Sequence, residues 1–250
     1  MEPESIELGF LSIFALLTFF IFLIVNKNSH KISNGALLDN DFTKPQAFHK
    51  EPVPRSGGVA SLISLFLFLI IYNVLYTEIL YNYLFICSSL FFVGYLDDLK
   101  IKINPNTRLV LMIVFLIIFI NVLSIQIYNI ELIFLNSWLQ NKIFLNIFII
   151  LCFLFIVNGA NLIDGFNGLL TINLIIINST LLFLNLKNNH LEFSFLLTGQ
   201  IIILISFLLF NFPKAKFFLG DSGSYLFGSI VALNIIYTNN LNPEVSSFFF

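Results

Sequence analysis

Charged residues are scarce in this sequence. Its 250 residues include 12 Lys and Arg, 14 Asp and Glu and 3 His, so charged side chains make up only 10%. A soluble globular protein carries about 25% charged residues, because its surface faces water. This shortage excludes a water-soluble enzyme and a disordered chain. The net charge of -2 is too small to indicate nucleic-acid binding.

Cysteine and histidine are also rare. Cys87 and Cys152 lie in separate apolar runs with no pairing motif, which excludes a disulfide scaffold and favours two small buried hydrophobes. His30, His49 and His190 are scattered and make no metal-ligand spacing. The sequence also contains no P-loop and no dinucleotide-binding fingerprint.

Long apolar runs dominate the rest of the chain. Hydrophobic residues make up 58% of it, and a helix needs about 20 mostly apolar residues to cross a membrane. We therefore predict an all-α polytopic membrane helix bundle in a single domain, with about eight transmembrane helices. The predicted spans are 8–25, 59–76, 80–96, 109–125, 143–157, 169–186, 193–212 and 225–237.

The distribution of basic residues predicts the orientation. With the N-terminus outside, two of the twelve bases, Lys142 and Lys187, fall in outer loops and the other ten fall in inner loops. This is a strong positive-inside signal. A ninth apolar run begins at Phe248, where the sequence ends, so we expect an N-terminal fragment of a longer chain.

Glycine-rich polar motifs occur in every inner loop and in no outer loop. The adjacent carboxylates of Asp97 and Asp98 repel each other at the predicted membrane border, which favours a cation beside them. Hard oxygen ligands with few histidines nearby suit Mg²⁺, or Mn²⁺, better than zinc. An ordinary acidic helix end is the alternative for this pair taken alone.

A second polar segment repeats every third residue, at Asn158, Asn161, Asp164 and Asn167. Steps of three keep side chains on a broad common face of a helix, where amides and a carboxylate can bind sugar hydroxyls or a base edge. The glycines in the segment let a ligand approach the backbone closely. A polar seam between packed helices is the alternative.

Asp221 is flanked by Gly220 and the small residues 222–224, shortly after Lys214 and Lys216. Such a carboxylate can hold a metal while backbone amides face phosphate oxygens. Attraction to anionic lipid headgroups is an alternative for the two lysines alone. Carboxylates and bases beside spans that can hold a hydrophobic tail together indicate phosphoryl transfer at the membrane interface.

On four motifs, in order, the chain resembles the polyprenyl-phosphate N-acetylhexosamine-1-phosphate transferases, a membrane superfamily. The motifs are His49-Lys50 with Pro54-Arg55-Ser56-Gly57-Gly58, Gly94-Tyr95-Leu96-Asp97-Asp98-Leu99-Lys100, Asn161-Leu162-Ile163-Asp164-Gly165-Phe166-Asn167-Gly168-Leu169 and Phe218-Leu219-Gly220-Asp221-Ser222-Gly223-Ser224. The matching region extends from about residue 49 to residue 228. The first motif is closer to the form found in enzymes that use UDP-GlcNAc or a related sugar.

The resemblance implies transfer of a sugar 1-phosphate, expected to be an N-acetylhexosamine 1-phosphate, from a UDP-sugar to undecaprenyl phosphate, with release of UMP. This would be the first membrane step of a cell-envelope polysaccharide pathway. It implies Asp221 as the Mg²⁺ ligand and Asp97, Asp98 and Asp164 as catalytic residues, with Asp97 favoured for orienting or deprotonating the lipid phosphate. The implied substrate-binding residues are Lys50, Arg55, Asn161, Gly165, Phe166, Asn167 and Phe218.

The resemblance also implies a location in a bacterial inner membrane and a site that faces the cytoplasm. It leaves the oligomeric state open, with a homodimer as one alternative. The chain departs from the family at Asn167, where many members have Asp. It also ends before a His-containing loop of the family, so we expect these 250 residues to be inactive alone. An ion-coupled transporter and a non-catalytic membrane scaffold are the competing functions. The uncharged spans argue against transport, because transporter sites usually lie near the bilayer midplane.

Overall fold

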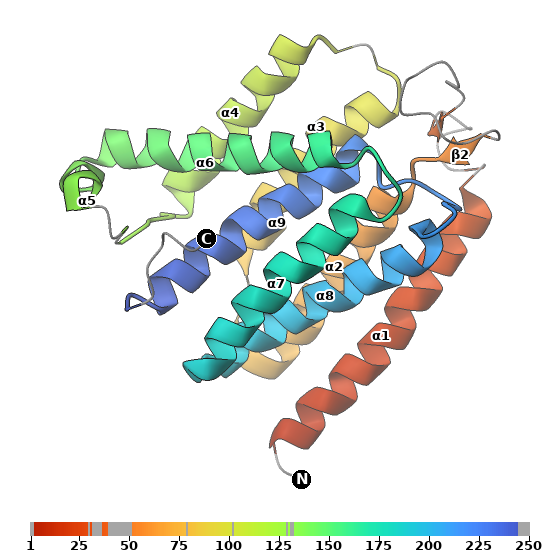
Figure 1. Cartoon of the computed structure of the whole chain (residues 1–250), viewed down its shortest axis with the longest axis horizontal. Helices are drawn as coiled ribbons and strands as arrows, with labels where there is room; N and C mark the ends of the chain where they lie inside the picture. Colours follow the sequence, from red (N-terminus) through yellow and green to blue (C-terminus); the bar gives the residue numbers. More distant parts are fainter. Residues whose placement is uncertain are drawn as a thin grey trace.

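The apolar runs form long helices, because a backbone in lipid must satisfy its hydrogen bonds within its own segment. The computed structural model describes residues 3–29, 31, 37–39, 52–78, 80–101, 103–128, 130 and 133–244. The helices are α1 (Pro3–Asn28), α2 (Gly57–Tyr76), the π-helix η2 (Tyr83–Cys87), α3 (Ser88–Asp98), α4 (Pro105–Val122), α5 (Ile133–Leu139), α6 (Lys142–Ile163), α7 (Leu169–Lys187), α8 (Leu191–Asn211) and α9 (Gly220–Leu241). Figure 1 shows them packed as one bundle.

The predicted all-α membrane bundle is confirmed, with a different number of spanning helices. Within the described ranges, six helices are long and apolar enough to cross a membrane: α1, α2, α4, α6, α7 and α8. The predicted ninth run at Phe248 lies outside the described residues.

The two other predicted spans are helical but differ from the six. Residues 80–96 fall on η2 and α3, where a π-helical turn precedes an α-helix of 11 residues. Residues 225–237 fall within α9, which has 22 residues but carries many Ser, Asn and Thr side chains that lower its hydropathy. The short helix α5 and the two-residue strands β1 (Leu38–Asp39) and β2 (Val53–Pro54) were not anticipated; the strands pair antiparallel.

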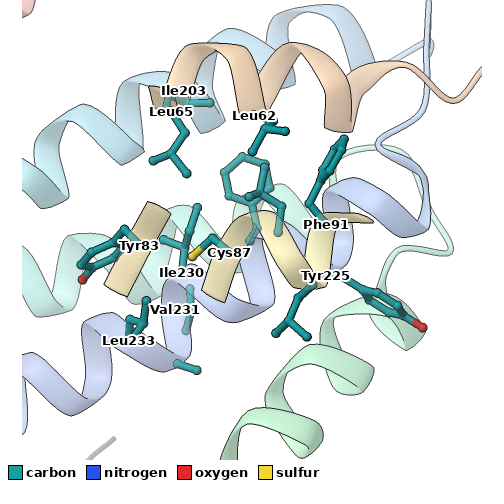
Figure 2. Close-up of a cluster of buried hydrophobic side chains, with 14 of the residues drawn as sticks. Leu62, Leu65, Tyr83, Cys87, Phe91, Ile203, Tyr225, Ile230, Val231 and Leu233 are labelled. Carbon is teal, nitrogen blue, oxygen red and sulfur yellow. The ribbon is translucent and has the colours of Figure 1, made fainter. Parts of the chain in front are cut away.

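Helix α9 occupies the centre of the bundle. It packs against α2, α3, α6, α7 and η2, and most of its side chains are buried. Figure 2 shows part of this core, where Leu62 and Leu65 of α2 and Cys87 and Phe91 lie around Ile230 of α9. A helix that is less apolar than α2, α6 and α7 thus packs among them.

A buried network satisfies the polar groups in the middle of α9. The Asn234 amide donates to Asn178 Oδ1 at 2.7 Å and to Gln200 Oε1 at 2.6 Å, and its own oxygen accepts from the Tyr83 hydroxyl at 2.7 Å. These partners come from α7, α8 and η2. Such bonds link helices in surroundings where water cannot compete for the polar groups.

A cluster of phenylalanines fixes the loop between α8 and α9. The buried Phe217 ring lies 5.9 Å from Phe22 of α1, 5.8 Å from Phe207 and 5.5 Å from Phe210, both of α8. Aromatic pairs at this spacing add to the stabilisation from apolar burial. Packing of Phe217 therefore anchors the loop that leads into α9. Phe218 and Gly220, which follow it, lie at the end of the bundle.

We expect the variant Asn234→Leu to lower the thermal unfolding midpoint of the detergent-solubilised protein. The substitution leaves the polar groups of Tyr83, Asn178 and Gln200 without this partner, at a cost of about 1–3 kcal/mol. The matched control is Asn173→Leu on α7, because the Asn173 side chain is exposed and bonds only its own helix at Leu169. Equal midpoints for the two variants would contradict the role of the network.

Candidate active site

Four segments that are distant in sequence meet at one end of the bundle, at the upper right of Figure 1. We call it the motif end. The start of α2 lies against the start of α9, with Gly57 N donating to Phe218 O and Gly58 N to Leu219 O, both at 2.9 Å. Phe218 N donates in return to Pro54 O at 2.8 Å. The first amides of a helix lack partners within it, so these bonds hold the first and fourth motifs together.

Asp98, the last residue of α3, caps the N-terminus of α9. Its carboxylate accepts hydrogen bonds from Asp221 N at 3.0 Å, Ser222 N at 2.9 Å and Ser222 Oγ at 2.6 Å. An anion at this place satisfies free amides and interacts favourably with the helix dipole. The Asp98 side chain has no exposed surface. Two adjacent carboxylates thus have different surroundings, because Asp97 remains one-third exposed.

Glycine is required at two positions around this cap. Gly220 has φ +77°, and a side chain there would overlap the carboxylate of Asp98. Gly94 lies one turn before Asp98 on α3, and a side chain there would overlap the backbone of Asp221. The motif glycines therefore let α3 and α9 approach closely enough for the cap to form.

Arg108, near the start of α4, joins Asp97 to Asp221. Its Nη1 atom lies 3.2 Å from Asp97 Oδ2 and 3.1 Å from Asp221 Oδ2. Sequence reasoning counted Arg108 only as one of the inner-loop bases and did not assign it to the site. The available signal was its place in the first turns of the helix that begins at Pro105, after the loop that follows Asp98.

Arg55 lies on the other side of the Asp98 carboxylate. Its Nη1 is 3.6 Å from Asp98 Oδ1, while Nε and Nη2 donate to Asp39 Oδ2 at 3.2 and 2.8 Å. Asp39 was also missed by sequence reasoning. It belongs to β1, and pairing of β1 with β2 brings it next to Arg55. Lys50, which was predicted to bind substrate together with Arg55, lies outside the described residues.

The third motif follows the end of α6. The Asn161 amide donates to Ser224 Oγ at 3.0 Å, which connects it to the first turns of α9. Asp164 is the C-cap residue of α6 and is half-buried. The exposed Asn167 side chain donates to Pro213 O at 3.1 Å in the loop before α9. Phe166 is 58% exposed.

The remaining residues predicted to bind substrate lie at the same end. Gly165, next to Asp164, is half-buried, and a side chain added there would meet no atom within 4 Å. Phe218 is half-buried and directly precedes Leu219 and Gly220 at the start of α9. The structure thus gathers every described residue of the predicted site at the motif end.

Three carboxyl groups at the motif end, those of Asp97, Asp98 and Asp164, have a raised pKa. Burial, and after it the neighbouring Asp221, raise the pKa of Asp97 to about 6 and the pKa of Asp98 to about 6. Burial also raises the pKa of Asp164 to about 8, with contributions from Asp221 and Asp98. Shifts of this kind in one cluster are typical of functional sites, where a bound cation can offset the crowding of negative charge.

The pair Asp97 and Asp221 fits a hard cation. Their Oδ2 atoms converge on a single nitrogen of Arg108. In the part of the chain that the structure describes, no group of three or more His, Cys, Asp or Glu side chains is arranged to hold a metal. Mg²⁺ is commonly bound by one or two carboxylates with substrate phosphates and water, so the two carboxylates are of the kind that the predicted magnesium site needs.

The chain is similar in sequence to known proteins. A sequence model described as Glycosyl transferase family 4 matches residues 80–239. The chain is also 34% identical, over 177 residues, to a phospho-N-acetylmuramoyl-pentapeptide-transferase of Prochlorococcus marinus (strain MIT 9215). That alignment covers 64% of this chain and 48% of the relative, so the chain spans about half the length of the curated relative it matches.

We expect Asp98→Ala to destabilise the protein more than Asp97→Ala. Removing the Asp98 carboxylate leaves three donors at the start of α9 unpartnered, at a cost of about 3 kcal/mol. Asp97 is the matched control, since it is adjacent and partly exposed and Arg108 bridges its carboxylate to that of Asp221. Thermal unfolding in detergent measures both variants. A smaller loss for Asp98→Ala than for Asp97→Ala would contradict the capping role.

Proposed function

Because the chain belongs to glycosyl transferase family 4, we propose that it transfers a sugar 1-phosphate from a UDP-sugar to undecaprenyl phosphate and releases UMP. The observation that carries the proposal is the joining of Asp97, Asp221 and Arg108 at one end of an apolar bundle. The name of the similar Prochlorococcus protein describes transfer of a phosphorylated amino sugar, which supports the same class of reaction.

In the proposed reaction, the lipid phosphate replaces UMP on the β-phosphorus of the UDP-sugar. An oxygen of the lipid phosphate attacks the β-phosphorus of the UDP-sugar and forms a new phosphorus–oxygen bond. The bond from that phosphorus to the bridging oxygen breaks, and UMP leaves with the electron pair. Both substrates are anionic, so the protein must supply positive charge and hold the reacting groups in line.

Asp221 is proposed to hold Mg²⁺, with Mn²⁺ as an alternative, and Asp97 to add negative charge beside it. When bound, the ion would offset negative charge on the phosphates. Arg108 and Arg55 would bind phosphate oxygens, for which the planar guanidinium is well suited. Asp97, the more exposed of the two adjacent carboxylates, is the proposed group that orients or deprotonates the lipid phosphate.

Asp98 and Asp164 are proposed to act differently from Asp97. The Asp98 carboxylate already accepts three hydrogen bonds, so its contribution to catalysis would be to position Asp221. Asp164, with a raised pKa, would be protonated at neutral pH before the cation binds and would contact the nucleotide sugar.

The nucleotide sugar is proposed to lie between the end of α6 and the start of α9. Its proposed contacts are Lys50, Arg55, Asn161, Gly165, Phe166, Asn167 and Phe218. The half-buried Phe218 supports contact with the uracil ring, and the amides of Asn161 and Asn167 can bind hydroxyl groups. The proposed substrate is UDP-GlcNAc or a related UDP-N-acetylhexosamine.

The proposed location is a bacterial inner membrane, with the N-terminus outside and the motif end facing the cytoplasm. Lys214 and Lys216 lie in the loop before α9 at the motif end, and Lys187 ends α7 at the opposite end. This arrangement supports the orientation, because cytoplasmic loops carry an excess of Lys and Arg.

The first test is UMP release by the full-length protein from UDP-GlcNAc, undecaprenyl phosphate and Mg²⁺. We expect Asp221→Asn and Asp97→Asn each to lower kcat/KM by about 100-fold or more, because each removes charge from the centre of the site. Glu192→Gln at the opposite end of α8 serves as the control and should keep the wild-type rate. A wild-type protein that releases UMP from no UDP-hexosamine would overturn the proposal and favour transport or scaffolding.

The second test is cysteine labelling from each side of the membrane. Lys214→Cys at the motif end and Lys187→Cys at the opposite end are both exposed positions. A membrane-impermeant maleimide added to intact cells should label Lys187→Cys and leave Lys214→Cys unlabelled until the cells are opened. Cells that carry the unsubstituted protein are the control, since the cysteines of this protein are Cys87 and Cys152. The reverse pattern would contradict the orientation.

A further inference from the structure

Tyr225 on α9 has a buried hydroxyl group with no partner among the described residues. Its side chain is 0% exposed, and its hydroxyl makes no hydrogen bond with the residues that the structure describes. Buried tyrosine hydroxyls usually find a partner, because an unpaired polar group in the interior costs free energy. A phenylalanine would fill the same space without that cost. The hydroxyl therefore needs an explanation other than packing.

The Tyr225 side chain extends toward the proposed active site. Figure 2 shows its ring at the N-terminal side of the α9 residues, with the hydroxyl directed away from Ile230 and Leu233. Tyr225 follows Asp221 by one helical turn, so the two side chains share a face of α9. Long side chains of a helix lean toward its N-terminus, which here is the turn of Asp221.

The ring of Tyr225 also contacts the guanidinium group of Arg108. The guanidinium carbon of Arg108 lies 5.8 Å from the centre of the Tyr225 ring, a distance at which a cation is attracted to an aromatic face. Arg108 in turn bridges Asp97 and Asp221. The ring thus supports the guanidinium, while the hydroxyl can donate a hydrogen bond but has no acceptor among the described residues.

An unpaired hydroxyl alone does not mark a site. Ser64 on α2 also has a buried hydroxyl without a partner in the described residues, and it lies two turns into its helix, away from the motif end. Tyr225 differs because Arg108 and Asp221 are beside it. A neutral phenol next to a guanidinium is suited to bind an anionic oxygen, since both groups donate hydrogen bonds.

We propose that Tyr225 is a substrate-binding residue, whose hydroxyl donates a hydrogen bond to a phosphate oxygen of the nucleoside diphosphate while its ring holds Arg108 in place. The inference rests on the proposed function and names a further contact of that site. No covalent change at Tyr225 is involved. In this proposal, the diphosphate group supplies the acceptor that the Tyr225 hydroxyl lacks.

The test compares Tyr225→Phe with the wild-type full-length protein. The substitution keeps the ring and removes only the hydroxyl. We expect kcat/KM for UDP-GlcNAc to fall by about 10- to 100-fold, as for loss of a hydrogen bond to a charged group. The melting temperature without ligand should stay the same or rise, because an unpaired buried hydroxyl has been removed. The increase in melting temperature caused by UDP with Mg²⁺ should shrink.

Two controls separate this contact from a structural role. Uridine, which lacks phosphate, should raise the melting temperature of Tyr225→Phe and wild type equally, and Ser64→Ala should respond to UDP like wild type. A Tyr225→Phe protein with wild-type kcat/KM and an unchanged response to UDP would overturn the inference, as would a lowered melting temperature with an unchanged response. If the wild-type protein neither releases UMP nor responds to UDP, the proposed function itself fails.

Discussion

The motif end depends on one interaction, the capping of α9 by the carboxylate of Asp98. Three donors at the start of α9 converge on this buried group. These hydrogen bonds fix the end of α3 against the first turn of α9, and so place Asp97 next to Asp221, where a single guanidinium reaches both. An acidic residue that is conspicuous in sequence thus serves to place two others.

The cap is possible because small residues line the contacts of α9 near the motif end. Gly94 allows α3 to approach the backbone of Asp221, and Gly58 lies directly against Gly223 where α2 meets α9. Farther along α9 the contacts change character, and amides such as Asn234 bond side chains of α7 and α8. Close backbone packing at one end and buried hydrogen bonds in the middle together hold α9 in a single register.

Much of this architecture could be predicted from the sequence. Long apolar runs in lipid have a helical solution, and glycine-flanked carboxylates at their ends are easily recognised, so the helices and the four aspartates were anticipated. Arg108 and Asp39 were not, since Arg108 is 113 residues from Asp221 and Asp39 is 16 residues from Arg55. Those pairs arise only from packing. The different surroundings of Asp97 and Asp98 could not be read from adjacent letters either, because they depend on which side of α3 faces α9.

The polar character of α9 has a consequence for biogenesis. Alone in the bilayer, its asparagines and threonines would have no partners, which makes spontaneous partitioning of this segment costly. Its partners Asn178 and Asn185 on α7 and Gln200 on α8 precede it in the chain and are synthesised first. The hydrogen-bond partners that offset the cost of these polar groups in an apolar bundle are therefore already present in the chain when α9 is made.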